Sequence, residues 1–343
     1  MSGQAIDQAA ALARLDALAK PRGSLGALEA VAARLAETQG TLTPVTKPRR
    51  IVLFAADHGC VAAGVTAWPS AVTQLMVATI AAGKAASSVL ARTTGTDLRL
   101  VDVGTLGATL DPAPAFYRYA LVRSGTANLA VRPAMSLADF NAAWALGAEE
   151  AKRAVADGCK VVAAGEMGIG NTTPSACLAM LLADLSLERA VGPGAGSDAA
   201  GMAIKRDVVD AAVHRARPLL ATDAKAAIAE VAGLEIVAMA GFYAAAAEVG
   251  ATVVLDGYVS GAAALIAERL VPACAKRLIA GHCSAEPGHR HVLAKLGLTP
   301  VLDWSLRLGE GTGALLAMPM LDAAAAIMTE MATLAELGVG RQD

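Results

Sequence analysis

Residues 160–174 read KVVAAGEMGIGNTTP: an apolar run, a loop with three glycines, and Thr172, Thr173 and Pro174 at the start of an alanine-rich helical pattern. A short apolar run of this kind is typical of a strand buried on both faces. Threonine caps helices, and proline suits the first helical turn. The stretch therefore predicts a strand, a tight loop and a helix whose N-terminus could hold a phosphate.

The same order of apolar run, loop and helical pattern recurs along the chain from residue 50 onward. Short aliphatic or β-branched runs, each leading into a loop with glycine or aspartate, cover 50–55, 98–103, 160–164, 252–255, 277–280 and 300–302. Six such alternations with helical patterns predict an α/β fold with a doubly wound, mainly parallel sheet and helices on both faces. Because the carboxyl ends of parallel strands meet at one edge, we expect the loops to form one ligand-binding rim.

The two ends of the chain have a different pattern. Residues 1–40 contain two helical patterns and no strand pattern, separated by KPRGSLG at 20–26, and a further helical pattern covers 323–337. These segments predict a small helical subdomain, formed by 1–40 with 323–343, beside a catalytic α/β domain over 41–322.

Composition narrows the class of protein. The 343 residues carry a net charge of −2 and only 3% aromatic side chains, which argues against a nucleic-acid partner. The mean hydropathy of +0.49 reflects alanine, and no run reaches the roughly 18 apolar residues that span a bilayer. The N-terminus lacks a signal-peptide pattern, and the five cysteines form no CxxC pair, so we expect a cytoplasmic protein without disulfides or a membrane partner.

The loop at 165–171 is the richest candidate for binding. Its glycines follow the spacing G-x-x-G-x-G, which is neither a Walker loop nor the dinucleotide fingerprint. Glycines let a ligand approach the backbone, although a purely structural strand-to-helix turn would use them too. The candidate substrate contacts are Gly168, Ile169, Gly170, Asn171 and Thr172.

A second glycine-rich loop, VGPGAGSD at 191–198, precedes a helical pattern that contains Lys205. Backbone N–H groups around Gly194 and the ammonium group of Lys205 could hold a phosphate. A plain surface connection is the alternative.

Glu310 is the first candidate for a catalytic acid. It stands in RLGEGTGA at 307–314, between two glycines and just before a strongly helical stretch. It could act on a ligand that approaches the backbone at Gly309, or it could only favour the helix dipole from the first helical turn. Glu166, in the 165–171 loop, is the second candidate.

No metal site is predicted, because the histidines and the cysteine within 282–291 lack the spacing of known zinc ligands. Asp57 and His58 are adjacent, and side chains of neighbouring residues rarely face each other. We therefore expect His58 to form a hydrogen bond at the rim and to position a loop.

Taken in order, the motifs resemble those of the nicotinate-nucleotide–dimethylbenzimidazole phosphoribosyltransferase family over nearly the whole chain. They are KPRGSLG at 20–26, ADHG at 56–59, VDVG at 101–104, GEMGIGNTT at 165–173, LDGY at 255–258, SAEPGH at 284–289 and RLGEGTGA at 307–314. The resemblance implies transfer of 5-phosphoribosyl from nicotinate mononucleotide to 5,6-dimethylbenzimidazole, giving α-ribazole 5′-phosphate and nicotinate. It also implies a homodimer, and the chemistry requires no metal or redox cofactor.

The resemblance also suggests roles for individual residues. Glu310 would be the general base that removes the benzimidazole proton, and Glu166 would lie near the ribose or the leaving group. The 5′-phosphate would lie at the Gly168–Thr173 helix start, near Lys205. Ser284 and Gly309 belong to the shared motifs and complete the substrate contacts. Met76 would belong either to an apolar wall for the aromatic base or to the core.

Two positions depart from the family pattern. Relatives usually read Tyr-Pro-Gln-Glu-Val-Thr where this chain has WPSAVT at 68–73, so Ser70 replaces the glutamine that is associated with the benzimidazole pocket. Pro193 stands where an arginine is common. The first departure bears on base preference and the second on phosphate contacts.

Two other functions stay open from the residues alone. A nicotinamide-dependent oxidoreductase would fit the sheet and glycine loops, but the forward G-x-G-x-x-G fingerprint is missing. A binding module for nicotinate mononucleotide without turnover is the second, which the loop acid Glu310 disfavours.

Overall fold

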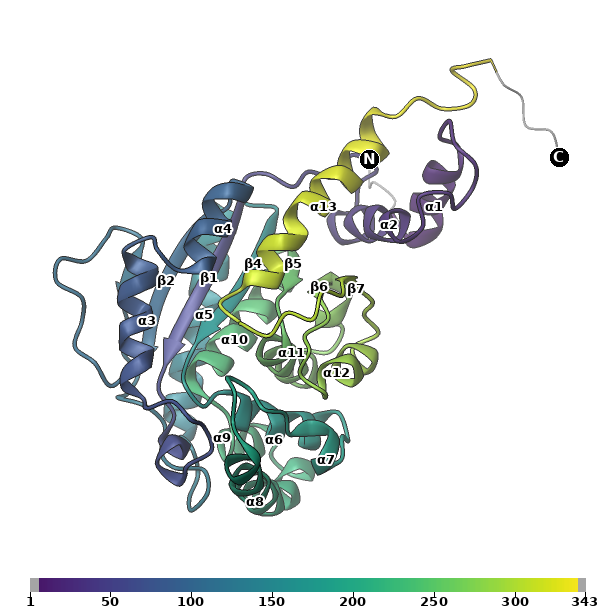
Figure 1. Cartoon of the computed structure of the whole chain (residues 1–343). Helices are drawn as coiled ribbons and strands as arrows, with labels where there is room; N and C mark the ends of the chain where they lie inside the picture. Colours follow the sequence, from purple (N-terminus) through teal and green to yellow (C-terminus); the bar gives the residue numbers. More distant parts are fainter. Residues whose placement is uncertain (1–5, 339–343) are drawn as a thin grey trace.

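The computed structural model describes residues 6–338, which form an α/β fold around one seven-stranded sheet (Figure 1). All paired strands run parallel, in the order β3-β2-β1-β4-β5-β6-β7. The strands are β1 Arg49–Ala56, β2 Asp97–Gly104, β3 Tyr117–Tyr119, β4 Val161–Met167, β5 Thr252–Leu255, β6 Leu278–His282 and β7 Pro300–Leu302. Strand order reverses direction between β1 and β4, and open α/β sheets bind ligands at such a switch.

The predicted fold class and all six predicted strands are confirmed. The structure adds β3, which pairs with β2 at the edge of the sheet. With three residues and a neighbouring loop on each side, β3 is too short to produce a recognisable strand pattern.

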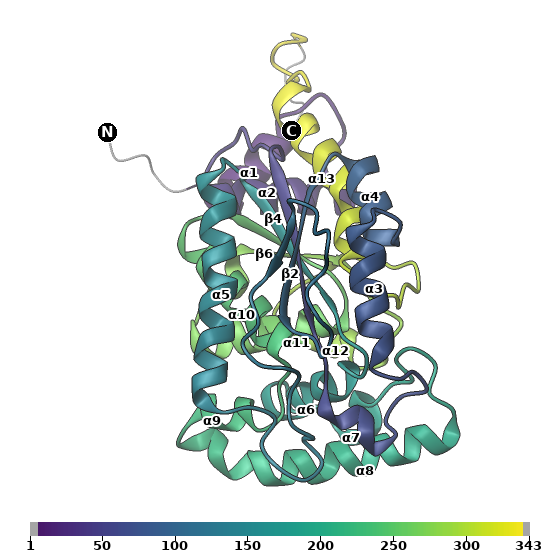
Figure 2. The ribbon, with the colours of Figure 1, turned by 90° about the vertical axis from the view of Figure 1, so that its left-hand side faces the viewer.

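Side chains of β1 alternate between two hydrophobic cores, one on each face of the sheet. Ile51 and Leu53 belong to the core on the first face, whereas Val52 and Phe54 belong to the core on the second face. Figure 2 shows the sheet nearly edge-on, with α5 (Leu137–Ala156) on one side and α3 (Ala71–Ala81), α4 (Ala86–Thr94) and α13 (Thr312–Glu330) on the other. The sheet is therefore covered on both faces, which is why its strands read as continuous apolar runs.

The helices have the following bounds. On the first face lie α1 Gln8–Asp16, α2 Ala27–Gln39, α3 Ala71–Ala81, α4 Ala86–Thr94 and α13 Thr312–Glu330. The others are α5 Leu137–Ala156, α6 Thr172–Leu182, α7 Leu187–Ala190, α8 Ala199–Ala216, α9 Ala224–Ala229, α10 Leu234–Glu248, α11 Tyr258–Leu270 and α12 His289–Lys295, with short 3-10 helices at Gly59–Ala63, Arg217–Ala221 and Cys274–Arg277.

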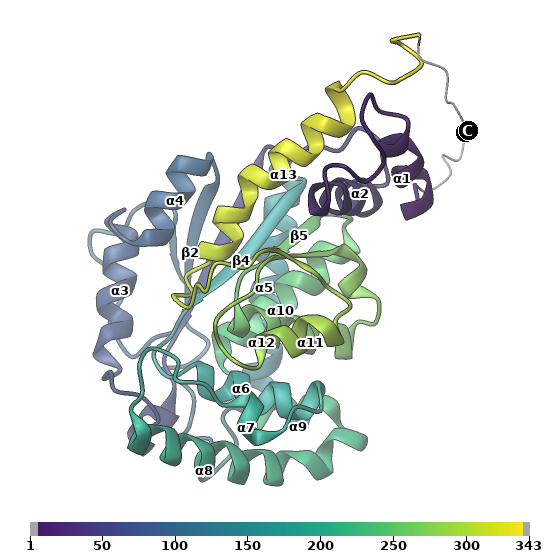
Figure 3. The ribbon, with the colours of Figure 1, turned by 45° about the vertical axis from the view of Figure 1, so that its right-hand side comes forward.

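The N-terminal helices α1 and α2 lie beside the far end of α13 (Figures 1 and 3). Backbone hydrogen bonds join the two ends of the chain: Ala19 N–H donates to Ala332 O at 2.8 Å, and Leu334 N–H donates to Ala17 O at 3.0 Å. The expected domain limit after residue 322 falls inside the continuous helix α13. The expected subdomain also includes 1–5 and 339–343, which lie outside the described residues, so the division into two domains stays a prediction.

Two segments, Ala71–Thr94 and Thr312–Glu330, are long and apolar enough to cross a membrane if only length and composition are considered. A core helix passes the same test. The second segment is α13, whose Leu315, Met318 and Leu321 are fully buried in the protein. The first is divided between α3 and α4.

Candidate active site

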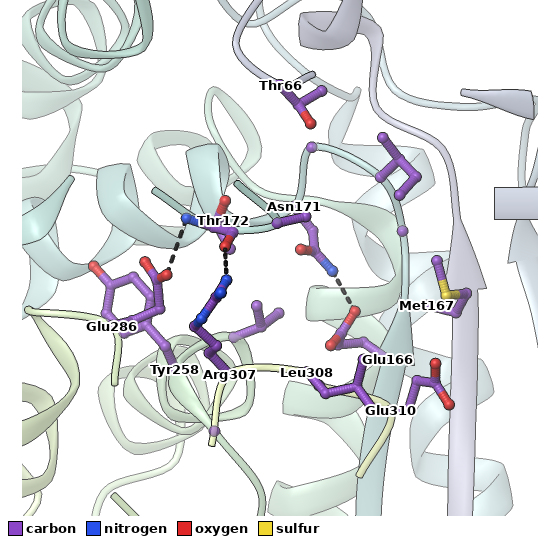
Figure 4. Close-up of a pocket in the computed structure, with 18 of the residues that line it drawn as sticks. Thr66, Glu166, Met167, Asn171, Thr172, Tyr258, Glu286, Arg307, Leu308 and Glu310 are labelled. Carbon is purple, nitrogen blue, oxygen red and sulfur yellow. Dashed lines mark hydrogen bonds between the residues drawn. The ribbon is translucent and has the colours of Figure 1, made fainter. Parts of the chain in front are cut away.

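A cavity of about 340 Å³ opens at the carboxyl ends of the central strands (Figure 4). It is bordered by residues from 65–76, 166–172, 193–197, 256–260, 282–286 and 307–310. These segments follow β1, β4, β5, β6 and β7 or bridge between them, so the expected single rim is present.

Most of the predicted site residues border this cavity. They are Glu166, Gly168, Ile169, Gly170, Asn171, Thr172, Gly194, Ser284, Gly309, Glu310 and Met76. Lys205 lies one contact behind the lining and bonds to Thr172. Ser70 is the residue directly before α3 and is not part of the lining. The roles of these residues in binding and catalysis stay predictions.

Glu310 has a strained backbone. It is the middle residue of three with positive φ: +85° at Gly309, +58° at Glu310 and +71° at Gly311. A left-handed conformation costs a side-chain-bearing residue about 1–2 kcal/mol, and such strain is concentrated at functional sites. Helix α13 begins only at Thr312, with Gly311 as its N-cap. Glu310 is thus not in the first helical turn, and the alternative of a helix-dipole role is wrong.

Asp256, just after β5, holds the turn that follows Glu310. Its Oδ1 accepts a hydrogen bond from Gly313 N–H at 2.7 Å, and its Oδ2 accepts one from Gly311 N–H at 3.1 Å. Burial alone would raise the pKa of Asp256, but His282 and the backbone N–H groups hold that pKa below its usual value. A buried charged carboxylate therefore fixes the start of α13.

The carboxylate of Glu310 is itself buried and accepts hydrogen bonds from Ser87 at the start of α4. Its Oε2 lies 3.0 Å from Ser87 Oγ and 3.5 Å from Ser87 N. Burial raises the pKa of Glu310; the Ser87 hydrogen bonds oppose the rise, and the negative charge of Asp256 adds to it. A carboxylate with a raised pKa is a stronger base, which suits proton abstraction near neutral pH.

Glu166 is the penultimate residue of β4 and lies close to the backbone that carries Glu310. Its Oε2 accepts a hydrogen bond from the side-chain amide of Asn171, and its Oε1 lies so close to Gly309 that a Cβ there would collide with it. Burial, followed by the negative charges of Glu235 and Asp256, raises the pKa of Glu166 to about 8. Glu166 is therefore mostly protonated at neutral pH and can donate a hydrogen bond.

The start of α6 borders the cavity through Asn171 and Thr172. Its N-cap residue Asn171 makes no capping bond, because its side chain is bonded to Glu166. The preceding loop is held from behind, where Ile169 N–H donates to Thr73 Oγ1 at 3.1 Å. A Cβ at Gly168 would lie 2.6 Å from Ala56 O, so only glycine fits there. The uncapped helix start is suited to an anion.

Lys205 and the second glycine-rich loop lie next to this helix start. The Lys205 ammonium group, buried on α8, donates to Thr172 Oγ1 at 2.8 Å and to Gly192 O at 2.9 Å. Burial lowers the pKa of Lys205, and the nearby carboxylate of Glu286 opposes the fall. A cation held in this way can contact a phosphate at the start of α6.

Glu286 and Arg307 also contact the second loop and were not predicted individually, although both belong to motifs of the family. Glu286 Oε1 accepts a hydrogen bond from Gly194 N–H at 3.0 Å, and Arg307 Nη1 donates to Gly194 O at 3.4 Å. Burial raises the pKa of Glu286, while Lys205, the Gly194 N–H and Arg307 oppose the rise. Figure 4 shows Glu286, Arg307 and Thr172 on one side of the cavity, and Glu166, Met167 and Glu310 on the other.

The remaining wall of the cavity is apolar. It consists of Val65, Trp68, Val72, Met76, Met167 and Ile169. Val72 and Met76 are four residues apart, so they share one face of α3. Ser70 precedes Val72 by two positions, about 200° around a helix, and this places it away from that face. The expectation that Ser70 belongs to the pocket is therefore not supported, whereas Met76 borders the cavity.

His58 is buried behind the 165–171 loop. Its Nε2 lies 2.8 Å from Glu235 Oε1 on α10 and 3.0 Å from the position of a Cβ at Gly168. This contact fits the expected role of positioning a loop. Within residues 6–338, no group of three or more His, Cys, Asp and Glu side chains is arranged to hold a metal ion, and all five cysteines are buried and free.

Comparisons with known proteins agree with this geometry. A family model described as Phosphoribosyltransferase matches residues 4–339. The nicotinate-nucleotide–dimethylbenzimidazole phosphoribosyltransferase of Thermus thermophilus is 47% identical to the chain, and the match covers 96% of the chain and 96% of that protein. The enzyme of the same name from Pseudomonas aeruginosa is 46% identical, over 95% of the chain and 92% of that protein. The crystal structure of CobT from Thermus thermophilus superposes with a TM-score of 0.93 at 46% identity, over 98% of this chain and 99% of that one. With identity this high over nearly every residue, the chain belongs to the nicotinate-nucleotide–dimethylbenzimidazole phosphoribosyltransferase family.

Proposed function

We propose that the protein transfers 5-phosphoribosyl from nicotinate mononucleotide to 5,6-dimethylbenzimidazole, giving α-ribazole 5′-phosphate and nicotinate. The relatives are named for this donor and this base. The observation that carries the proposal is the buried carboxylate of Glu310, with its raised pKa, in one cavity with an apolar wall and an uncapped helix start.

In this proposal the two substrates occupy opposite sides of the cavity. The donor phosphate lies at the start of α6, where Lys205 and Arg307 supply positive charge. The aromatic base lies against the wall that contains Val72 and Met76. This arrangement is supported by Figure 4, in which Thr172 and Arg307 lie on one side of the cavity and Met167 and Glu310 on the other.

The proposed reaction is a displacement at C1′ of the ribose. One benzimidazole nitrogen forms the new bond to C1′ as the bond from C1′ to the nicotinate nitrogen breaks. The bonding electron pair leaves with nicotinate, whose ring becomes neutral. The second benzimidazole nitrogen then carries an acidic N–H, and Glu310 takes that proton. Protonated Glu166 donates a hydrogen bond to the ribose or to the leaving group, and the rate gain comes largely from positioning.

The test is to incubate the protein with nicotinate mononucleotide and a panel of benzimidazoles, purines and phenols, with mass detection of products. We expect α-ribazole 5′-phosphate and one equivalent of nicotinate from 5,6-dimethylbenzimidazole, and no product when the panel compound is left out. The matched control is Glu310→Gln, which keeps the size of the side chain but cannot take the proton, so turnover should fall by about 10²–10⁴-fold. Binding of nicotinate mononucleotide without any product from the panel would contradict the proposal.

We also propose that the enzyme works as a homodimer in the cytoplasm. Large apolar side chains at Leu75, Leu106, Trp304 and Leu308 are more than half exposed in the single chain, which supports burial against a second copy. Free, buried thiols suit a reducing compartment. Sedimentation that gives the mass of one chain, or fractionation that finds the enzyme outside the cytosol, would contradict the respective statement.

A further inference from the structure

Two segments that are distant in sequence are hydrogen-bonded to each other where the cavity opens. Trp68 Nε1 donates to Ala195 O at 3.1 Å, and Ser197 Oγ donates to Val65 O at 3.3 Å. All four residues border the cavity. Trp68 is 49% exposed, so its ring lies at the opening rather than in the core.

The first of these segments belongs to the apolar wall. Val65 and Trp68 precede α3, whose Val72 and Met76 continue the same wall. Since the indole N–H of Trp68 is held by Ala195 O, the orientation of this aromatic ring depends on the position of residue 195.

The second segment, 192–197, belongs to the polar side of the cavity. Lys205 donates to Gly192 O, Glu286 accepts from Gly194 N–H, and Arg307 donates to Gly194 O. Gly194 and Gly196 have φ values of +55° and +109°, which residues with side chains rarely adopt. We call residues 192–197 the strap. Its polar contacts with Glu286 and Arg307 are at Gly194, and its hydrogen bond with Trp68 is at the next residue, Ala195.

A phosphate at the start of α6 adds a contact to the two cations that hold this strap. Lys205 uses two of its three N–H donors, on Thr172 and Gly192, and Arg307 uses one of its five, on Gly194, so both can bind the phosphate without releasing the strap carbonyls. Cations that the phosphate holds in place restrict the motion of residues 192–194 and so of Ala195, which is the next residue. A ligand that orders such a shared segment lowers the entropy cost of binding a second ligand beside it.

We propose that Trp68 is a positioning residue that couples the two ligand subsites: through the Trp68–Ala195 hydrogen bond, an occupied phosphate subsite orders the aromatic wall and tightens binding of the base. The inference rests on the proposed function, because it takes the two sides of the cavity as sites for the phosphoribosyl donor and the base. It goes beyond that function by assigning a role to a residue outside the reacting atoms.

Ribose 5-phosphate and 5,6-dimethylbenzimidazole are suitable probes, because the first lacks the nicotinate leaving group and the pair cannot react. Calorimetry gives Kd of the base with and without saturating ribose 5-phosphate. We expect the phosphate to tighten base binding by about 5-fold or more in the parent protein, within the usual range of coupling between sites. The reverse titration must give the same factor, since coupling is reciprocal.

Trp68→Phe keeps an aromatic ring and removes the indole N–H, so the coupling factor should fall close to one while each probe alone still binds. Ser197→Ala removes the second hydrogen bond and should lower the factor partly. Trp144→Phe is the matched control, because Trp144 lies on α5, stacks on Phe140 and stands outside the cavity lining, and it should keep the parent factor. A coupling factor of one in the parent, or a parent-like factor in Trp68→Phe, would overturn the inference while leaving the proposed function intact. Failure of the parent to bind either probe would instead contradict the proposed function and the coupling with it.

Discussion

Asp256 positions Glu310 through the backbone: its carboxylate accepts the N–H groups of Gly311 and Gly313, on the helix side of Glu310, at 3.1 and 2.7 Å. The two acids come from different loops, one after β5 and the other after β7. Asp256 remains charged because His282 and backbone N–H groups lower its pKa, whereas burial raises the pKa of Glu310. Two neighbouring carboxyl groups with opposite pKa shifts can therefore take different roles, one structural and one as a base.

Asp256→Asn should lower kcat by about 10²-fold, because a displaced base loses much of its effect. The reason is geometric: an amide oxygen can accept only part of the N–H bonds that hold the start of α13. The same substitution in a Glu310→Gln protein should cost little more, since Asp256 acts through Glu310. Additive losses in this double-mutant cycle would show that Asp256 acts independently.

The lowered pKa of Asp256 also predicts how stability depends on pH. Its native pKa lies below the unfolded value, so its contribution to stability is present above the unfolded pKa and is lost as pH falls through the native pKa. Thermal unfolding of the parent and of Asp256→Asn should therefore differ most above about pH 4, the unfolded range of an aspartate, and converge in acid. A difference in Tm that grows as the pH is lowered would contradict this sign.

Ser87→Ala should shift the acidic limb of the kcat–pH profile to higher pH. The hydrogen bond from Ser87 Oγ favours the charged form of Glu310, so its loss raises a pKa that burial has already raised, while the backbone N–H of residue 87 remains as a donor. Glu310 can accept a proton only when it is deprotonated, so a higher pKa of Glu310 moves the rise in kcat to higher pH. Ser88→Ala is the matched control, because Ser88 Oγ donates to Ile80 O and not to Glu310. Superimposable profiles for Ser87→Ala and the parent would reject Glu310 as the titrating base.

Lys205→Met should raise KM for nicotinate mononucleotide by about 10-fold or more, the usual effect of losing a charged hydrogen bond, with a smaller effect on KM for the base. The ammonium group is buried beside Thr172 and Gly192, where the donor phosphate is proposed to lie. Arg206→Met changes the next residue, which is exposed on α8, and should behave like the parent. Equal changes in the two KM values would argue for a general structural defect instead.

Base preference should respond to Met76 and not to Ser70. Met76→Ala enlarges the apolar wall, so discrimination among substituted benzimidazoles should change by about 10-fold, the scale of one or two methylene groups in a pocket. Ser70→Gln should leave the ranking of the same panel as it is, because Ser70 is not part of the lining. A new ranking in Ser70→Gln would mean that longer side chains at this position do reach the base.

The sheet could be predicted from the sequence because its strands are buried on both faces. Runs such as 252–255 then stand out between alanine-rich helices, while the three residues of β3 do not. Asp256 comes one residue after the predicted strand at 252–255, and Glu166 two residues after the one at 160–164, so their place at the rim was predictable. Their pairing with Gly311 and Asn171 depends on how the loops meet in space, which no local pattern contains.

Other contacts of the site come from helices rather than from strand ends. Ser87 lies in an ordinary helical segment, and only the packing of α4 against the turn at Glu310 brings it to the carboxylate. Ser70 shows the opposite case, because it occupies a motif position of the family but is absent from the cavity lining, to which α3 contributes Val72 and Met76. The deep contact between His58 and Glu235 joins residues that are 177 positions apart in sequence.

The left-handed backbone conformation of Glu310 should decide which residues laboratory evolution selects at this position. Glycine adopts this conformation without the strain that a glutamate bears, and it would also remove a buried acid whose pKa is displaced. Libraries screened for heat resistance alone should therefore accumulate Glu310→Gly, whereas libraries screened for turnover should retain glutamate. Selection for thermal stability and selection for turnover would then favour different residues at position 310, glycine in the first case and glutamate in the second.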